Sequence, residues 1–201
     1  MRVAPLGPAN LGAFSALFEA CGSACFCRYW HFEGTKNEWL ARTFEAPAEN
    51  RDEQRALALH DDLGARGLLA MNVDDAPTAI GWMKLAPRTR MAKLRRLGPY
   101  RLLEDDPATA DDATWVIGCL LVHPAHRGRG VARRLIAAAD DHVRAWGGSA
   151  VEAYPRGTVD TTVRLHPEEA WMGTDALFAS LGFARVAGEP AYPVYRKRLF
   201  P

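Results

Sequence analysis

A short turn rich in glycine and arginine has the clearest chemical character in this sequence. Residues 127–130 read Arg-Gly-Arg-Gly; an apolar run that Pro124 ends precedes them, and a helical pattern begins at Val131. The first N–H groups of a helix lack partners within the helix and lie at the positive end of its dipole. Glycine lets an anion approach these groups, and arginine adds positive charge. The turn is therefore predicted to bind a phosphate group.

The segments on either side would hold this turn in place. Residues 114–122 form a nearly unbroken apolar run, as expected for a strand buried on both faces. After the turn, apolar residues recur at helical spacing until Gly147, which predicts an amphipathic helix. Two other phosphate-binding turns fit less well: no Lys-Ser or Lys-Thr follows the glycines, and Arg133 stands where a Rossmann turn needs its third glycine.

The turn and its flanks resemble the coenzyme A loop of the GCN5-related N-acetyltransferase (GNAT) superfamily. The signature of that loop, Arg/Gln-x-x-Gly-x-Gly/Ala, is matched by residues 127–132, and Val122-x-Pro124 stands before it. Leu181-Gly182-Phe183 is similar to the end of the family's late helix. Residues 152–155, Glu-Ala-Tyr-Pro, resemble a poorly characterised bacterial branch of the superfamily. Together the motifs cover roughly residues 65–199.

The resemblance implies an α/β (α+β) fold with a single domain over residues 1–201, in which a mixed, mostly antiparallel twisted sheet carries helices on both faces. The core would lie roughly within residues 65–199, and residues 1–64 would supply N-terminal helices and a wall on the acceptor side. In this family the central strand and the following strand splay apart, and the pantetheine arm of acetyl-CoA enters the gap. The residues implied to bind acetyl-CoA are Leu120, Leu121, Val122, Arg127, Gly128, Arg129, Gly130, Val131, Ala132 and Arg133.

The implied activity is N-acetyltransfer from acetyl-CoA to an amine, by direct transfer in a ternary complex. The acceptor would be a small-molecule amine or a peptide, and a homodimer is one possible assembly. The sequence does not identify the acceptor, although Trp30, Trp39, Trp82, Trp115 and Tyr100 could line an aromatic pocket for it.

Periodicity and turn residues predict the remaining elements. Residues 67–73 and 78–85 read as a β-hairpin, residues 150–154 as a strand, and residues 174–181 as a helix followed by two closing strands. In the N-terminal part, Asn50 and Glu53 resemble a helix-capping pair, ahead of an apolar stripe that Gly64 closes. With 201 residues, 48% of them hydrophobic, and no low-complexity linker, the chain fits one well-formed core.

The usual catalytic groups of the family are missing from their expected positions. Family members often carry a glutamate base on the central strand and a tyrosine four residues before the late glycine; these positions correspond to Val116 and Phe178. Glu152 and Tyr154 are two residues apart and would share a face of a regular strand, which favours them as a base and proton-donor pair. The alternative is a surface glutamate beside a packed tyrosine.

Two further residues are candidates for the chemistry. Cys119, on the predicted central strand, could accept an acetyl group, but the sequence shows no cationic neighbour that would activate its thiol. His31 could serve as a base near neutral pH, although a histidine between Trp30 and Phe32 is more often a packed wall residue. Catalysis by positioning and a water relay, without a dedicated base, is a third possibility.

The cysteine pattern gives an expectation about metal and compartment. Cys21, Cys25, Cys27 and His31 amount to four possible zinc ligands, but tetrahedral sites usually use two separated pairs, so buried, inert thiols and no metal are expected. The four cysteines do not form the spread framework of a small secreted protein, and no apolar run is long enough to span a membrane. A cytoplasmic location is expected.

Charge leaves two other classes of function open. The formal net charge of +1 gives no overall basicity that would favour nucleic acid, so no nucleic-acid partner is expected. A basic run at residues 88–96 reads as a solvated face, with a substrate or 3′-phosphate contact as the alternative, and a nucleic-acid-binding regulator would have to use this run. A non-catalytic acyl-CoA sensor or partner-binding module would explain the missing acid and tyrosine.

Overall fold

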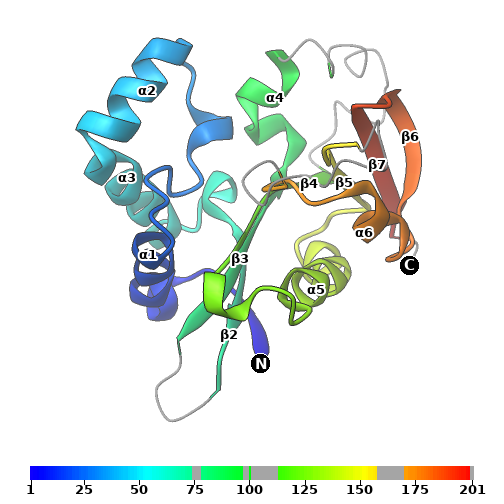
Figure 1. Ribbon diagram of the computed structural model, residues 1–201, viewed down its shortest axis with the longest axis horizontal. Helices are drawn as coiled ribbons and strands as arrows, with labels where there is room; N and C mark the ends of the chain where they lie inside the picture. Colours follow the sequence, from blue (N-terminus) through cyan, green and yellow to red (C-terminus); the bar gives the residue numbers. More distant parts are fainter. Residues whose placement is uncertain (74–77, 97–99, 101–112, 158–169, 200–201) are drawn as a thin grey trace.

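The protein is organised around a seven-stranded sheet with the strand order β1-β2-β3-β4-β5-β7-β6 (Figure 1). A computed structural model describes residues 1–73, 78–96, 100, 113–157 and 170–199. The strands are β1 (Arg2–Pro5), β2 (Gly67–Met71), β3 (Ala79–Pro87), β4 (Thr114–Val122), β5 (Ala150–Ala153), β6 (Ala184–Glu189) and β7 (Tyr192–Arg198). The helices are α1 (Leu11–Ala20), α2 (Lys36–Glu45), α3 (Pro47–Leu59), α4 (Ala92–Arg96), α5 (Val131–Ala145) and α6 (Asp175–Ala179).

Antiparallel pairing dominates the sheet. Among the described strands, only β4 and β5 pair in parallel, as expected when α5 forms a crossover between them. The predicted hairpin is present as the antiparallel β2–β3 pair, while its predicted turn at residues 74–77 lies outside the described residues. Every residue of β2 and β3 is buried, in keeping with their apolar sequences, which only Lys84 of β3 interrupts.

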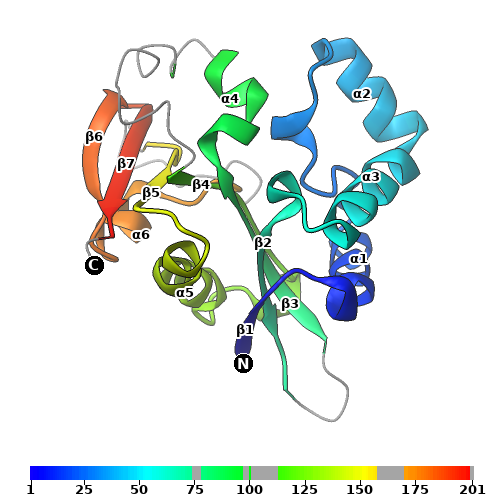
Figure 2. The ribbon, with the colours of Figure 1, turned by 180° about the vertical axis from the view of Figure 1, so that it is seen from behind.

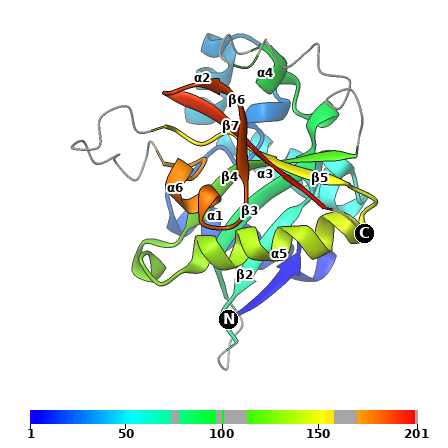
Figure 3. The same ribbon diagram turned by 90° about the vertical axis from the view of Figure 1, so that its right-hand side faces the viewer.

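Helices cover both faces of the sheet. In Figure 1, α1, α2 and α3 lie on one side and α5 and α6 on the other, and Figure 2 shows the same two layers from behind. Figure 3 shows α5 running along the sheet. The buried side of α5 includes the predicted stripe of Val131, Leu135, Ala139 and Val143. The predicted fold class is thus confirmed. No helix of the described ranges combines the length and the apolar character needed to cross a bilayer.

The N-terminal part departs from the sequence-based prediction. β1, which pairs with β2, and α2 were not predicted, and α3 begins at Pro47, three residues before the predicted cap. The Asn50 side chain is fully buried and donates to the Ala24 carbonyl, so it does not cap the helix. The capping prediction was wrong because proline, with its fixed φ, starts the helix earlier. The buried face then carries Asn50, Gln54 and Ala58, and the two amide side chains bind loop carbonyls.

A bulge in β4 determines which side chains face which layer. Lys84 of β3 pairs with Cys119 and Leu85 pairs with Ile117, so Gly118 is an extra residue in β4. The bulge reverses the alternation: Ile117 packs in the α5 layer, and Cys119 packs on the α1 side. A methyl group at Gly118 would lie 2.9 Å from Met91 Cε and 3.0 Å from Trp30 Cδ1, so a larger residue there would have to displace the end of Met91 and press on the Trp30 ring.

Candidate active site

The predicted phosphate turn connects the end of β4 to α5. Gly128 and Gly130 have φ values of +73° and +76°, in the left-handed region that costs other residues about 1 kcal/mol or more. A Cβ at either glycine would meet no atom within 4 Å, so the space in front of the turn is open. Gly130 is the N-cap of α5, no described side chain caps this helix, and its first turn contains no acidic residue. The N–H groups at this helix end therefore remain available to an anion.

Basic side chains surround the turn. The Nε of Arg127 donates to the Val122 carbonyl at 3.3 Å, and the guanidinium of Arg133 donates to Ser180 Oγ at 2.9 Å. A groove of about 660 Å³ begins at Gly130 and runs between β1 and α5, where Arg2 and Arg134 also border it. This surface has the charge and the room for a polyanionic ligand.

β4 extends beyond its parallel partner. β5 pairs with Thr114–Ile117 only, whereas β4 continues to Val122. Loop segments satisfy the backbone groups on this free edge: the Leu120 N–H donates to the Trp171 carbonyl at 2.7 Å, and the Gly118 carbonyl accepts from Trp30 Nε1 at 2.6 Å. Among the described strands, β4 therefore has no parallel partner beyond Ile117, as the implied splay requires, and a carbonyl of the chain itself accepts from the Leu120 N–H. No sequence signal pointed to this use of Trp171.

Glu152 and Tyr154 lie together, as their spacing predicted. The Tyr154 hydroxyl donates to Glu152 Oε2 at 2.5 Å, and Arg196 of β7 binds Glu152 Oε1 at 2.6 Å. The guanidinium of Arg88 also faces this carboxylate, with Nη1 3.8 Å from Glu152 Oε2. The Glu152 side chain is completely buried, so the surface-glutamate alternative was wrong.

This pair also lies close to the position where the family usually has its base. Glu152 is the direct partner of Val116 in the β4–β5 register, and partner residues of neighbouring strands point to the same face. Tyr154 and Val116 belong to one buried cluster, and the rings of Tyr154 and Tyr100 meet edge to face at 4.9 Å. Burial and then the Glu152 charge raise the pKa of Tyr154 well above its ordinary value, so its hydroxyl stays protonated.

The other two candidates, Cys119 and His31, are half-buried and in less reactive forms. Cys119 does have a cationic neighbour, Lys84 on β3, contrary to the sequence-based expectation, but a hydrogen bond to Cys27 and burial raise the pKa of Cys119 well above its usual range. His31 lies 2.7 Å from the Arg90 carbonyl through Nδ1, and burial lowers its pKa well below the ordinary value. His31 is therefore neutral, and Cys119 is a protonated thiol.

Some of the tryptophans lie in the hydrophobic core, and others lie near the free edge of β4. Trp82 and Trp115 pack in the cores of the α1 and α5 layers, so they do not line an acceptor pocket. Trp30 stacks on Trp171 at 5.5 Å, and Tyr29 contacts both Trp30 and Trp39. These rings form one aromatic surface beside the free edge of β4.

The basic run at residues 88–96 is only in part a solvated face, since Arg90 and Arg96 are exposed and Arg88 is buried. Arg88 is buried against Glu152, and Lys93 Nζ lies over the rings of Tyr29 and Phe32, at 4.7 and 4.8 Å. The interpretation as a solvated face was therefore wrong for these two residues. Neither contact could be inferred from the sequence, because the partners are separated from the run by many residues.

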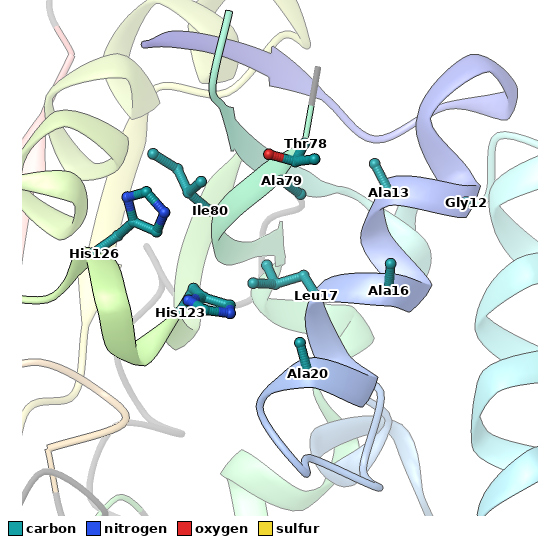
Figure 4. A pocket seen from close by; sticks show the side chains of 10 residues that line it. All are labelled: Gly12, Ala13, Ala16, Leu17, Ala20, Thr78, Ala79, Ile80, His123 and His126. Carbon is teal, nitrogen blue, oxygen red and sulfur yellow. The ribbon is translucent and has the colours of Figure 1, made fainter. Parts of the chain in front are cut away.

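A pocket of about 450 Å³ lies between α1 and the beginning of β3 (Figure 4). Its walls are mainly small apolar side chains, with the imidazoles of His123 and His126 on the side of the phosphate turn. His123 Nδ1 accepts the Ala125 N–H and so orders the approach to the turn. Within the described residues, no group of three or more His, Cys, Asp or Glu side chains is arranged to hold a metal ion.

Comparison with known proteins identifies the family. Residues 27–168 match the model of the acetyltransferase (GNAT) family. No curated protein matches the chain.

Solved structures share the fold. An acetyltransferase of the GNAT family from Listeria monocytogenes superposes with a TM-score of 0.56 at 12% identity, covering 98% of this chain and 94% of that one. A GNAT-family acetyltransferase from Desulfovibrio desulfuricans gives 0.52 at 17% identity, covering 99% and 100%. The PaiA N-acetyltransferase of Thermoplasma acidophilum, solved in complex with coenzyme A, gives 0.52 at 11% identity, covering 98% and 99%. The chain belongs to the acetyltransferase (GNAT) family and is an acyltransferase.

Proposed function

We propose that this protein transfers the acetyl group of acetyl-CoA directly to an amine of a small molecule or peptide, within a ternary complex. The observation that carries the proposal is the junction of β4 and α5. There, the free edge of β4 is followed along the chain by two glycines with positive φ and then by an uncapped helix N-terminus. A compartment rich in reduced thiols, such as the cytoplasm, suits the four free cysteines.

The residues of the turn would hold the pyrophosphate of the donor. The N–H groups at the start of α5, together with Arg127 and Arg129, provide donors and positive charge, and the groove at Gly130 gives room for the nucleotide end. When bound, acetyl-CoA supplies a thioester whose carbonyl carbon is open to attack by an amine. The role of the chain is to position both reactants and to supply donors and a proton.

The Leu120 N–H is the proposed donor to the acyl oxygen. It points away from β3 and already binds a carbonyl, that of Trp171, so an acceptor oxygen fits at this position. A preorganised N–H of this kind stabilises negative charge as it develops on oxygen. We infer that the Trp171 carbonyl leaves this N–H when the donor binds.

Tyr154 is the proposed proton donor, and Glu152 positions it. The Glu152 carboxylate accepts bonds from Arg196 and from Tyr154, so it holds the hydroxyl in one orientation, and its own lone pairs are engaged. Such a carboxylate orients its neighbour more readily than it removes a proton from an amine. Cys119 would take no covalent part, because its thiol stays protonated. The buried Glu152–Tyr154 pair next to Val116 favours an enzyme over a non-catalytic acyl-CoA sensor.

The test compares two glycines at opposite ends of α5. Gly130 and Gly147 both have positive φ and open space where a methyl group would be added, but only Gly130 belongs to the turn. Each alanine substitution should destabilise the fold by about 1 kcal/mol. Gly130→Ala should weaken acetyl-CoA binding, measured by calorimetry, about tenfold, equivalent to about 1.4 kcal/mol, because its methyl group intrudes on the pyrophosphate. Gly147→Ala should bind as the wild type does.

Equal binding by both variants would overturn the assignment of the turn. A separate measurement addresses catalysis: release of free coenzyme A is followed with a panel of polyamines, amino acids, aminoglycosides, arylamines and peptides. Release with at least one amine supports the enzyme. Tight acetyl-CoA binding without release from any of them would favour the sensor.

A further inference from the structure

A cluster of thiols and buried cations lies on the α1 side of β3 and β4, and the proposed chemistry does not use it. Cys27 and Trp82 are buried there, with Cys119 packed against them. The indole N–H of Trp82 donates to Cys27 Sγ at 2.9 Å, and Cys119 packs against the same cluster. Two cysteines that are far apart in the sequence therefore meet in the core.

The backbone that presents Cys27 is strained. Phe26 and Cys27 have φ values of +41° and +60°, so two consecutive residues that are not glycine adopt the left-handed region. Such conformations cost about 1–3 kcal/mol each and persist where the surroundings hold them, often at functional positions. The strained pair turns the Cys27 thiol toward Trp82 and Cys119, whereas Cys21 and Cys25 remain closer to the surface of the same loop.

A buried lysine supplies positive charge to this cluster. Lys84, next to Cys119 in the β3–β4 register, is 0% exposed, and its ammonium donates to the Gly64 carbonyl. Burial disfavours the Cys27 thiolate, but hydrogen bonds from Cys119 and Trp82 and the charges of Lys84 and Arg28 outweigh it, so the pKa of Cys27 lies below its ordinary value. The same contact raises the pKa of Cys119, which makes Cys119 the protonated partner.

We propose that Cys27 and Cys119 form an oxidation-sensitive thiol pair, in which a hydroperoxide oxidises Cys27 and Cys119 then closes a disulfide with it. The Trp82 donor, the buried Lys84 and the strained backbone at Cys27 together distinguish this thiol from the other cysteines. The thiolate is the form of cysteine that attacks oxidants, and nearby positive charge and hydrogen-bond donors favour it.

The chemistry is a two-electron oxidation in two steps. The Cys27 thiolate attacks the terminal oxygen of the hydroperoxide; an S–O bond forms, the O–O bond breaks, and the departing alkoxide takes a proton to become an alcohol, or water if the oxidant is hydrogen peroxide. The Cys119 sulfur then attacks the sulfenic acid of Cys27. The S–S bond forms, the S–O bond breaks, and hydroxide leaves with the Cys119 proton as water. The thiol pair is oxidised and the hydroperoxide is reduced.

The disulfide would join the N-terminal wall to β4 beside the acyl site. Cys119 lies between Gly118, whose carbonyl binds Trp30, and Leu120, whose N–H is the proposed oxyanion donor. Oxidation would thus place a covalent link next to the acyl position. That consequence rests on the proposed function, whereas the oxidation itself does not, so the two can fail independently.

The test uses the full chain with Cys21→Ser and Cys25→Ser, which leaves Cys27 and Cys119 as its two cysteines. The reduced protein is treated with equimolar hydrogen peroxide. Mass spectrometry should show the loss of a pair of hydrogens, and thiol titration under denaturing conditions should show no free thiol. Both changes should reverse with dithiothreitol. Persistence of two free thiols, or a higher mass from added oxygen without a disulfide, would overturn the proposal.

Further variants assign the order of events. In Cys119→Ser, Cys27 should accumulate as a sulfenic acid that dimedone traps, because the resolving thiol is gone. Lys84→Met, which keeps a long side chain without its charge, should slow oxidation roughly tenfold. Cys25→Ser alone is the matched control: burial raises the pKa of Cys25 to about 11, so its removal should leave the rate unchanged. Oxidation that depends on Cys25 instead of Cys27 would contradict the assignment. Circular dichroism confirms that each variant is folded.

Discussion

The hydroxyl of Tyr154 is the proton donor that we propose for the site. It is 1% exposed, and its one hydrogen lies between the phenol oxygen and the Glu152 carboxylate. The raised pKa keeps this proton on the tyrosine at physiological pH, where a departing thiolate could receive it. Arg196 in turn binds Glu152 Oε1 and so provides the buried carboxylate with a cationic partner.

Replacing Tyr154 with phenylalanine should therefore reduce catalysis without reducing donor binding. We expect kcat to fall roughly 100-fold for Tyr154→Phe, the usual contribution of a positioned acid. The dissociation constant for acetyl-CoA, measured by calorimetry, should stay within about twofold of wild type, well under the 1.4 kcal/mol of a tenfold change. Tyr195→Phe is the control, since Tyr195 of β7 pairs with Ala153 and is packed against the α5 core instead. Equal kcat values for the two variants would remove Tyr154 from the mechanism.

Among the elements, β3 contains an unusual feature for a central strand, a fully buried lysine. Burial lowers the pKa of Lys84 to about 7, with the Cys27 charge acting in the opposite direction. An unfolded chain binds the Lys84 proton up to a pH of about 10.4, its ordinary pKa. Between these values the unfolded state holds a proton that the folded state lacks, so this group makes the free energy of unfolding rise with pH.

Lys84→Met should flatten this pH dependence. From pH 7 to pH 10 the wild type should gain stability relative to the variant, by roughly 1 kcal/mol per pH unit. Urea unfolding of both proteins at several pH values gives the difference directly, and the remaining cysteines and tyrosines titrate in both. A constant difference between the two proteins over this range would mean that Lys84 is not desolvated as described.

The 3-10 turn before β2 and helix α3 supply the polar groups around the Lys84 side chain. Lys84 binds the Gly64 carbonyl in the short 3-10 turn Leu63–Ala65, before β2, and Arg28 also approaches that carbonyl, at 3.4 Å. Gln54 of α3 donates to the neighbouring Ala65 carbonyl. The buried amide of Gln54 thus satisfies a backbone carbonyl next to the Lys84 site, which an apolar side chain in its place could not do.

For the molecule as a whole, the proposed binding of the donor at the Leu120 N–H would compete with a contact within the chain. The Trp171 carbonyl binds the Leu120 N–H, and the Trp171 ring stacks on Trp30. A ligand that takes this N–H must displace Trp171, so the binding free energy is reduced by the cost of moving it.

Acetyl-CoA should therefore change tryptophan fluorescence and stabilise the fold. The fluorescence change should saturate with the dissociation constant found by calorimetry, and Trp171→Phe should remove most of the change while binding persists. At a donor concentration about 100 times the dissociation constant, the melting temperature should rise by roughly 5–10 °C, from a stabilisation of about 2.7 kcal/mol. An undiminished fluorescence change in Trp171→Phe would show that Trp171 stays in place.

Local sequence was sufficient to predict the phosphate turn, β4, α5 and the β2–β3 hairpin. Gly128 and Gly130 adopt conformations that few other residues tolerate, and apolar spacing records which face of each element is buried. The spacing of Glu152 and Tyr154 likewise predicted their contact, because side chains two apart on a strand share a face.

The surroundings of these groups, in contrast, depend on how distant segments pack. Arg196 reaches Glu152 only because β7 pairs with β5, and Cys27 reaches Cys119 only because the N-terminal loop packs on β3 and β4. Trp171 occupies the Leu120 donor because β5 ends before β4 does. Contacts between residues far apart in the chain depend on strand order and register, which local periodicity does not encode. The sequence by itself therefore predicted the turn proposed to bind the donor, and only the tertiary structure decided which partners surround Glu152, Tyr154 and Leu120.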